Sequence, residues 1–130
     1  MKFFISYRYT GEDLSELNDY MRRLHDILEG RGNEVYSTLF DEELPKETKK
    51  LFNHSYKKLE NSDVILVLLK SNDKSEGMLM EIGYAVAKGK KVILAIDKNV
   101  ENTYLGDLLD NVIEYDGMED LFEKLAEVDL

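Results

Sequence analysis

The chain has 130 residues, 43% hydrophobic and 34% charged, a composition typical of one globular domain with a core of its own. Its formal net charge of −10 excludes a generally basic surface, so we expect no nucleic-acid partner. The chain has no cysteine, which excludes disulfides and thiolate chemistry, and its two histidines lie in no Cys/His cluster, so we expect no metal site.

No apolar run in the sequence approaches the roughly 18 residues needed to cross a bilayer. The first eight residues contain only four apolar ones before polarity returns, which is too few for a secretory signal. We therefore expect a cytoplasmic protein without a membrane partner.

Periodicity predicts five strands that alternate with helices, with no linker, low-complexity tract or internal repeat between them. The predicted elements are, in chain order, a strand at 2–6, a helix at 11–30, a strand at 33–37, a helix at 46–59, a strand at 63–69, a helix from Ser75 to Gly89, a strand at 91–96, a short helix at 105–109, a strand at 112–115 and a helix at 118–128. The strands at 63–69 and 91–96 are apolar on both faces, which is typical of central parallel strands.

This alternation predicts an α/β fold in which residues 1–130 form a single domain, a flavodoxin-like or Rossmann-like three-layer sandwich. Its five-stranded parallel sheet would have the order 2-1-3-4-5. Ligands of such sheets bind outside the carboxyl ends of the strands, where the strand order reverses. That point lies between the first and third strands, so the loops at 6–11 and 70–77 are predicted to border one crevice.

Glu81 interrupts the apolar stripe that Met78, Ile82 and Ala85 form on the third long helix. A carboxylate there loses hydration, and the residues three and four positions away offer no partner of opposite charge. Two interpretations are open. Glu81 is either a structural carboxylate that accepts a hydrogen bond from a backbone amide or Arg8, or a nucleophile or general base with a pKa adjusted by burial.

The first loop carries Ser6, Arg8 and Thr10 just before a predicted helix start, where backbone amides favour an anion and arginine can add a bidentate contact. It matches neither a Walker A loop nor a Gly-x-Gly-x-x-Gly motif. In the alternative interpretation, Thr10 caps the helix and Arg8 pairs with a nearby carboxylate, Glu12 or Asp13. Ser75 is likewise either an anion ligand or only the cap of its own helix.

His54 and Ser55 are adjacent on the second predicted helix, and from the residues alone both are interpreted as structural surface positions. A Ser-His-acid hydrolase would need a nucleophile elbow, and no Gly-x-Ser-x-Gly motif occurs in the chain.

The segment Ser75-Glu76-Gly77-Met78-Leu79-Met80-Glu81-Ile82-Gly83-Tyr84-Ala85 resembles the signature of the nucleoside 2-deoxyribosyltransferase family, a glycine followed by Glu-Leu/Ile-Gly-x-Ala. The Asn61-Ser62-Asp63-Val64 entry to the third strand is also similar, and the shared strand layout covers nearly the whole chain. The resemblance implies that Glu81 attacks C1′ of a sugar and expels the base, and that the resulting ester passes to water or another base. An oxocarbenium-like centre is stabilised by such a carboxylate. No metal or organic cofactor is implied.

Ser75 makes the implied substrate more specific. Members that act on nucleosides carry an aspartate six residues before the nucleophile, whereas the branch that hydrolyses nucleoside 5′-monophosphates carries a serine. Because an aspartate would repel a phosphate and a serine with helix amides would accept one, Ser75 implies a monophosphate substrate, with Ser6 and Arg8 as further phosphate contacts. Tyr7 and Gly77, in the same two loops, are also expected to bind the substrate.

Two positions depart from the family pattern. Ser55 replaces an aspartate of the second helix that orients the base or the glutamate, and it is retained here as an expected substrate-binding position. Phe3 lies near the position of a family tyrosine and offers no hydroxyl. These departures leave the preferred base open, and they keep a non-catalytic nucleotide-binding module as an alternative.

A second resemblance concerns Phe4-Ile5-Ser6-Tyr7-Arg8 with Gly11-Glu12-Asp13, which is similar to the opening of a TIR domain. Enzymatic members of that family cleave NAD with a glutamate on the third helix, so a TIR-like NAD glycohydrolase or signalling domain is the alternative enzyme. The Trp-Cys pair typical of TIR domains is absent, which favours the nucleotide hydrolase. Nucleoside 2-deoxyribosyltransferases commonly form dimers or rings in which a neighbour closes the site, so we expect a homodimer or higher homo-oligomer.

Overall fold

Five parallel strands form one sheet in the computed structural model, which describes residues 1–130, and their order is β2-β1-β3-β4-β5. The elements are, in chain order, β1 (Lys2–Ser6), α1 (Leu14–Gly30), β2 (Glu34–Tyr36), the 3-10 helix η1 (Thr38–Phe40), α2 (Thr48–Glu60), β3 (Val64–Leu69), α3 (Glu76–Ala87), β4 (Lys91–Asp97), α4 (Leu105–Leu108), β5 (Asn111–Tyr115) and α5 (Met118–Glu127). The predicted Rossmann-like fold and strand order are therefore confirmed. None of the helices is long and apolar enough to cross a membrane.

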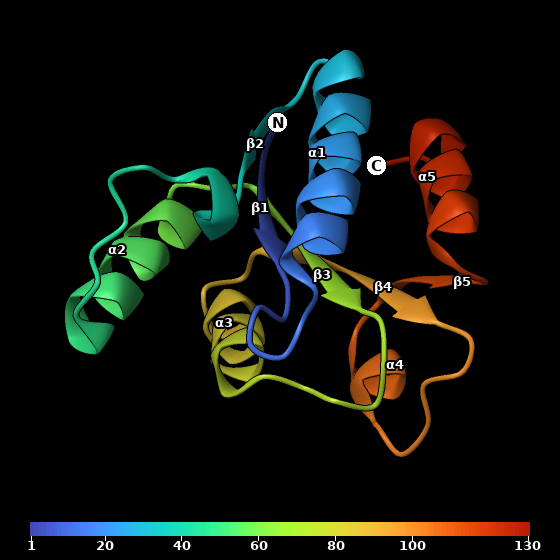
Figure 1. Ribbon diagram of the computed structural model, residues 1–130. Coiled ribbons are helices and arrows are strands. Elements are labelled where there is room, and N and C mark those ends of the chain that lie inside the picture. The colour runs from blue at the N-terminus through green and yellow to red at the C-terminus, as the bar shows by residue number, and fades with distance from the viewer.

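Helices cover both faces of the sheet, and Figure 1 shows α1 and α5 together on one of them. Side chains of alternate strand residues meet these two helices in a cluster of 16 buried residues. The other face packs against α2 and α3 in a smaller cluster of 10 buried residues. The central strand β3 is buried along its whole length because both of its faces are covered, as its continuous apolar sequence predicts.

The start of α1 differs from the predicted one. The helix begins at Leu14, because the Asp13 side chain accepts a hydrogen bond from the amide of Glu16 and so caps the first turn. The expectation of a helix start at Gly11 with Thr10 as its cap is wrong. Gly11 instead has φ +84°, a left-handed conformation that lets the preceding loop turn before the helix.

The edge strand β2 pairs with only the first part of β1. Its three residues match Lys2, Phe3 and Phe4, so the last two residues of β1 have no neighbour on that side. After Tyr36 the chain leaves the sheet through η1, which lies between the strand predicted at 33–37 and the helix predicted at 46–59. The early end of β2 thus leaves the carboxyl end of β1 open on one edge.

Candidate active site

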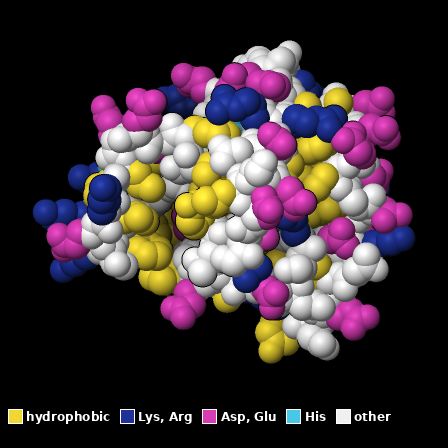
Figure 2. All heavy atoms as spheres, in the orientation of Figure 1, with side chains coloured by type: hydrophobic (Ala, Val, Ile, Leu, Met, Phe, Trp, Pro, Cys, Tyr) yellow, Lys and Arg dark blue, Asp and Glu magenta, His cyan; other side chains and the backbone are white.

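A cavity of about 260 Å³ lies beside the open end of β1. Figure 2 shows the surface hollowed there, with hydrophobic side chains on both sides of the hollow. Residues of the end of β1, the first loop, η1, α2 and the cap and first turns of α3 line the cavity. They are Ile5, Tyr7, Tyr9, Thr10, Thr38, Leu51, Phe52, Ser55, Ser75, Gly77, Met78 and Glu81. The two loops that the topology predicts to border one crevice both contribute to it.

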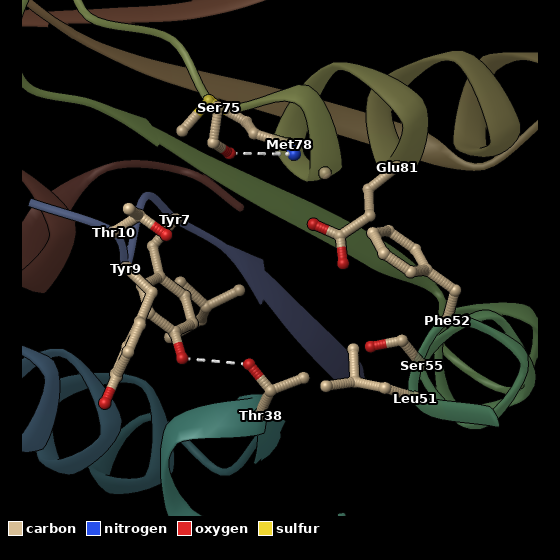
Figure 3. A pocket seen from close by; sticks show the side chains of 12 residues that line it. Tyr7, Tyr9, Thr10, Thr38, Leu51, Phe52, Ser55, Ser75, Met78 and Glu81 are labelled. Atoms are coloured by element: carbon tan, nitrogen blue, oxygen red, sulfur yellow. Dashed lines mark hydrogen bonds between the residues drawn. The ribbon is translucent and has the colours of Figure 1, made fainter. Parts of the chain in front are cut away.

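Glu81 extends its carboxylate from the second turn of α3 into this cavity (Figure 3). Its neighbours on the apolar stripe, Met78, Ile82 and Ala85, are buried against the sheet. The partner of Glu81 is Ser6, the last residue of β1, whose Oγ donates a hydrogen bond of 2.7 Å to Oε1. Neither a backbone amide nor Arg8 holds this carboxylate.

The electrostatic environment of Glu81 favours its neutral form. Burial raises its pKa from the ordinary 4.5 to about 7, although the hydrogen bond from Ser6 acts in the opposite direction. No lysine or arginine lines the cavity to counter the effect of burial. A substantial fraction of the Glu81 carboxyl is therefore ionised, and a substantial fraction protonated, near neutral pH.

Hydroxyl groups lie on the side of the cavity away from α3. The Tyr7 hydroxyl and Thr38 Oγ1 are 2.9 Å apart and hydrogen-bonded, and burial raises the pKa of Tyr7 to about 12, so its phenol is neutral. Ser55 is only 2% exposed and its side chain points into the cavity towards Glu81 (Figure 3). The surface position expected for Ser55 from the second helix alone is therefore wrong.

Ser75 and Gly77 border the cavity at the start of α3. Ser75 caps the helix, since its Oγ accepts a hydrogen bond of 3.0 Å from the Met78 amide. A cap and a ligand contact are compatible, because a hydroxyl that accepts one bond still has a proton to donate. A Cβ at Gly77 would lie 3.5 Å from Cζ of Phe52, so the glycine keeps this part of the cavity open.

Arg8 belongs to the first loop but, unlike Tyr7, Tyr9 and Thr10, does not line the cavity. Its Nη1 is 3.9 Å from Oδ2 of Asp73, so the guanidinium joins the loops after β1 and β3. The expected alternative partners, Glu12 and Asp13, are not its partners. A Cβ at Gly11 would lie 2.6 Å from Nη2 of Arg8, which shows how closely the guanidinium packs on this glycine.

The structure therefore brings together Tyr7, Ser55, Ser75, Gly77 and Glu81 in one cavity. Ser6 is fully buried, and the one hydrogen bond of its side chain is the bond that it donates to the Glu81 carboxylate.

Apart from Ser55, the wall formed by η1 and α2 is the largest part of the site that the sequence does not predict. Leu51, Phe52 and Ser55 follow the spacing of one helix face, a signal that identifies a face but not the cavity that it meets. His54, expected at the surface, is half-buried, and its Nε2 lies 2.8 Å from Oδ2 of Asp41.

These features define an α/β domain with a carboxylate in a cavity at the carboxyl end of a parallel sheet. The family model for nucleoside 2-deoxyribosyltransferase matches residues 10–119, and the chain belongs to this family of enzymes. No curated protein sequence gives a significant match to the chain.

Solved structures agree with this membership. The Clostridium botulinum CMP N-glycosidase BcmB is 25% identical, with a TM-score of 0.70 over 96% of this chain and 97% of its own. A 2-deoxyribosyltransferase from Bacillus psychrosaccharolyticus is 18% identical, with a TM-score of 0.73 over 99% of this chain and 93% of its own. A conserved protein from Enterococcus faecalis V583 is 17% identical, with a TM-score of 0.66 over 95% of this chain and 96% of its own. The last two show that the fold is shared.

Proposed function

We propose that this enzyme cleaves the N-glycosidic bond of a nucleoside 5′-monophosphate, with Glu81 as the nucleophile and water as the final acceptor. The observation that carries the proposal is the placement of the Glu81 carboxylate. One of its oxygens accepts the hydrogen bond from Ser6, while the group faces a cavity with aromatic side chains in its walls.

The proposed reaction has two steps. A Glu81 oxygen forms a bond to C1′ while the bond from C1′ to the base nitrogen breaks and its electron pair leaves with the base. Water then attacks C1′ of the glycosyl ester, which releases the sugar phosphate and restores the carboxylate. The proton that water loses balances the proton that the departed base takes up. Burial favours the first step because a carboxylate that has lost hydration is a stronger nucleophile, and Ser6 keeps it oriented.

Ser75 and the first amides of α3 are proposed to receive the phosphate, because the positive end of a helix stabilises an anion. Arg8 lies nearby on the first loop and would contact the phosphate by leaving Asp73, a pair in which the aspartate is largely exposed. Ser6, expected to contact phosphate, is better explained as the residue that orients Glu81, because it is buried and bonded to the carboxylate. The similarity to a CMP N-glycosidase supports a monophosphate substrate.

The base is proposed to lie against the wall made by η1 and α2. Phe52 and Tyr7 offer aromatic surface for a planar ring, and Ser55 and Thr38 offer hydroxyls for its polar edge. Since these hydroxyls both donate and accept, they suit more than one base.

A panel of ribo- and deoxyribonucleoside 5′-monophosphates, the matching nucleosides and NAD tests the function. Chromatography should show release of free base from at least one monophosphate, and none from NAD. Cleavage of NAD alone would instead support the TIR-like alternative. Binding of a monophosphate by calorimetry without base release would support a non-catalytic nucleotide-binding module.

The acceptor and the assembly need separate measurements. With water as acceptor, base release should proceed without a second base, and mass spectrometry of quenched reactions should find a sugar phosphate on the peptide that contains Glu81. We further propose that the 130 residues act as a single domain in a homodimer or higher homo-oligomer, which light scattering would test. EDTA should leave the rate unchanged if the reaction needs no metal.

A further inference from the structure

The helix α2 forms one wall of the cavity but is weakly packed on the rest of the protein. Only Ser55 and Leu59 are buried among its 13 residues. Figure 1 shows α2 lying out beside the sheet, at the end of the long connection from β2. With so little buried apolar area, the position of this helix depends on contacts at its sides.

The cavity-facing strip of α2 consists of Leu51, Phe52 and Ser55. Because successive helical residues are about 100° apart, His54 and Tyr56 lie on opposite sides of this strip. Each of them is held by another element. His54 Nε2 is 2.8 Å from Oδ2 of Asp41, and the Tyr56 ring stacks on Tyr84 of α3 with centroids 4.9 Å apart and an interplanar angle of 11°.

Asp41 is itself firmly fixed. The Tyr36 hydroxyl donates to its Oδ2 at 2.5 Å, and the Glu43 amide donates to its Oδ1 at 2.9 Å. Burial raises the pKa of Asp41, but the hydrogen bonds from Tyr36, His54 and the Glu43 amide together lower it below its ordinary value. The carboxylate is therefore ionised near neutral pH, and its hydrogen bonds are charge-assisted.

We propose that Asp41 and His54 are positioning residues that fix the rotation of α2, so that Phe52 and Ser55 face Glu81 across the cavity. The part of this inference that concerns catalysis rests on the proposed function. Asp41 joins the end of β2 and the turn after η1 to the middle of α2, so both elements of the wall share one anchor. Without the bond to His54, the part of α2 that lines the cavity is held at its sides by the stack of Tyr56 on Tyr84 alone, because the ion pair of Glu60 with Lys88 holds only the last residue of the helix. That part of α2 then turns about the stack.

The expected kinetic effect follows from which groups move. Glu81 belongs to α3 and is held by Ser6, so the nucleophile stays in place when α2 turns. The wall contacts the base equally before and during the reaction, and loss of such contacts raises KM while kcat is largely kept. A contribution to folding alone would lower the midpoint of thermal unfolding and leave KM unchanged.

The test compares His54→Ala with His54→Gln, because a glutamine amide nitrogen reaches the place of Nε2 and can donate to Asp41. His54→Ala should raise KM for the best monophosphate about tenfold and leave kcat within about twofold. His54→Gln should restore most of the loss. Glu60→Gln is the matched control, because Glu60 makes an exposed 3.4 Å ion pair with Lys88 at the other end of α2. KM of this control should not change.

Hydrogen–deuterium exchange provides a readout that needs no turnover. Amides of residues 48–56 should exchange faster in His54→Ala than in the wild type and in Glu60→Gln, while those of β3 stay protected. Unchanged exchange in α2 together with unchanged KM or nucleotide affinity would overturn the positioning role. Equal losses of thermal stability in the alanine and glutamine variants of His54, with KM unchanged, would also overturn the positioning role. If the wild type releases no base, the exchange data still decide on the positioning role, so the two failures are distinguishable.

Discussion

Oγ of Ser6 donates a 2.7 Å hydrogen bond to Oε1 of Glu81 and joins two residues that are 75 positions apart in the chain. Ser6 ends β1, where it pairs with Val67 of β3, so the hydroxyl is presented from the sheet itself. The bond therefore fixes the carboxylate relative to the buried centre of the sheet, as the proposed role of a nucleophile requires.

Replacement of the proposed nucleophile should separate binding from chemistry. Glu81→Gln keeps the shape of the side chain, so monophosphate affinity by calorimetry should change little, while base release should fall by about 10³-fold or more. Glu123→Gln removes an exposed carboxylate of α5, which does not line the cavity, and serves as the control. A Glu81→Gln variant with near wild-type turnover would rule out the nucleophile assignment.

The hydrogen bond from Ser6 should be visible in the pH profile. This bond lowers the pKa of Glu81, so Ser6→Ala should raise that pKa above its present value of about 7. The nucleophile must be ionised, so the acidic limb of kcat/KM should move to higher pH, with a smaller loss at alkaline pH where the carboxylate is fully ionised. An unshifted limb, or one moved to lower pH, would contradict this role.

Glu81 should also make folding stability depend on pH in an unusual direction. Its pKa is about 7 in the folded protein against an ordinary 4.5, so the folded state binds this proton more tightly than the unfolded state. The contribution of the protonated Glu81 to the free energy of unfolding is fully present below the ordinary pKa of 4.5, and it is lost as the pH rises through the folded-state pKa of about 7. Glu81→Gln should therefore gain stability relative to the wild type between about pH 5 and pH 8 in urea unfolding. A constant difference across that interval would show that Glu81 does not titrate there.

The start of α3 should distinguish nucleotides from nucleosides. Ser75→Asp keeps a good helix cap but places a negative charge where the phosphate is proposed to bind. KM for monophosphates should rise by about tenfold or more, with little change for nucleosides. Ser75→Asn, a neutral cap of similar size, should have a much smaller effect. Equal effects of the two variants would argue against a phosphate at this position.

Two glycines at different places in the fold should respond to alanine in opposite ways. Gly11 has φ +84°, and a Cβ there would lie 2.6 Å from Nη2 of Arg8, so Gly11→Ala should destabilise the fold by about 1–3 kcal/mol and displace the guanidinium. Gly30, at the end of α1, has open space where a Cβ would lie, with no atom within 4 Å, and Gly30→Ala should stabilise the helix by about 0.5–1 kcal/mol. In thermal unfolding, the midpoint temperature should fall for Gly11→Ala and rise for Gly30→Ala.

The sheet is predictable from the sequence because its signals are local. Two strands apolar on both faces and the regular alternation with helices are enough to give the strand order that the structure has. The start of α1 is predicted too early because Thr10 and Gly11 resemble a helix entry, while the observed cap is Asp13. The short η1 gives no periodic signal, so periodicity does not predict it.

For the site, the sequence identifies Glu81, because a carboxylate on an apolar stripe breaks the helical period. Its partner cannot be identified in this way. Ser6 ends β1 and Glu81 lies on α3, 75 positions later, so only the packed fold brings the two together. The bond between His54 and Asp41 also depends on tertiary structure, since the long connection after β2 determines where α2 lies. Local patterns therefore reveal the proposed nucleophile, and long-range packing determines its surroundings.

The unequal packing of the two sheet faces has a consequence for engineering this enzyme. The larger buried cluster lies under α1 and α5, and Ile5 is its only member that lines the cavity, whereas α2 contributes only two buried residues to the fold. Most of the apolar area that stabilises the fold thus lies outside α2, the helix that is proposed to contact the base. A combinatorial library at positions 51 and 52 should consequently yield mostly folded variants, from which new base preferences can be selected without first stabilising the scaffold.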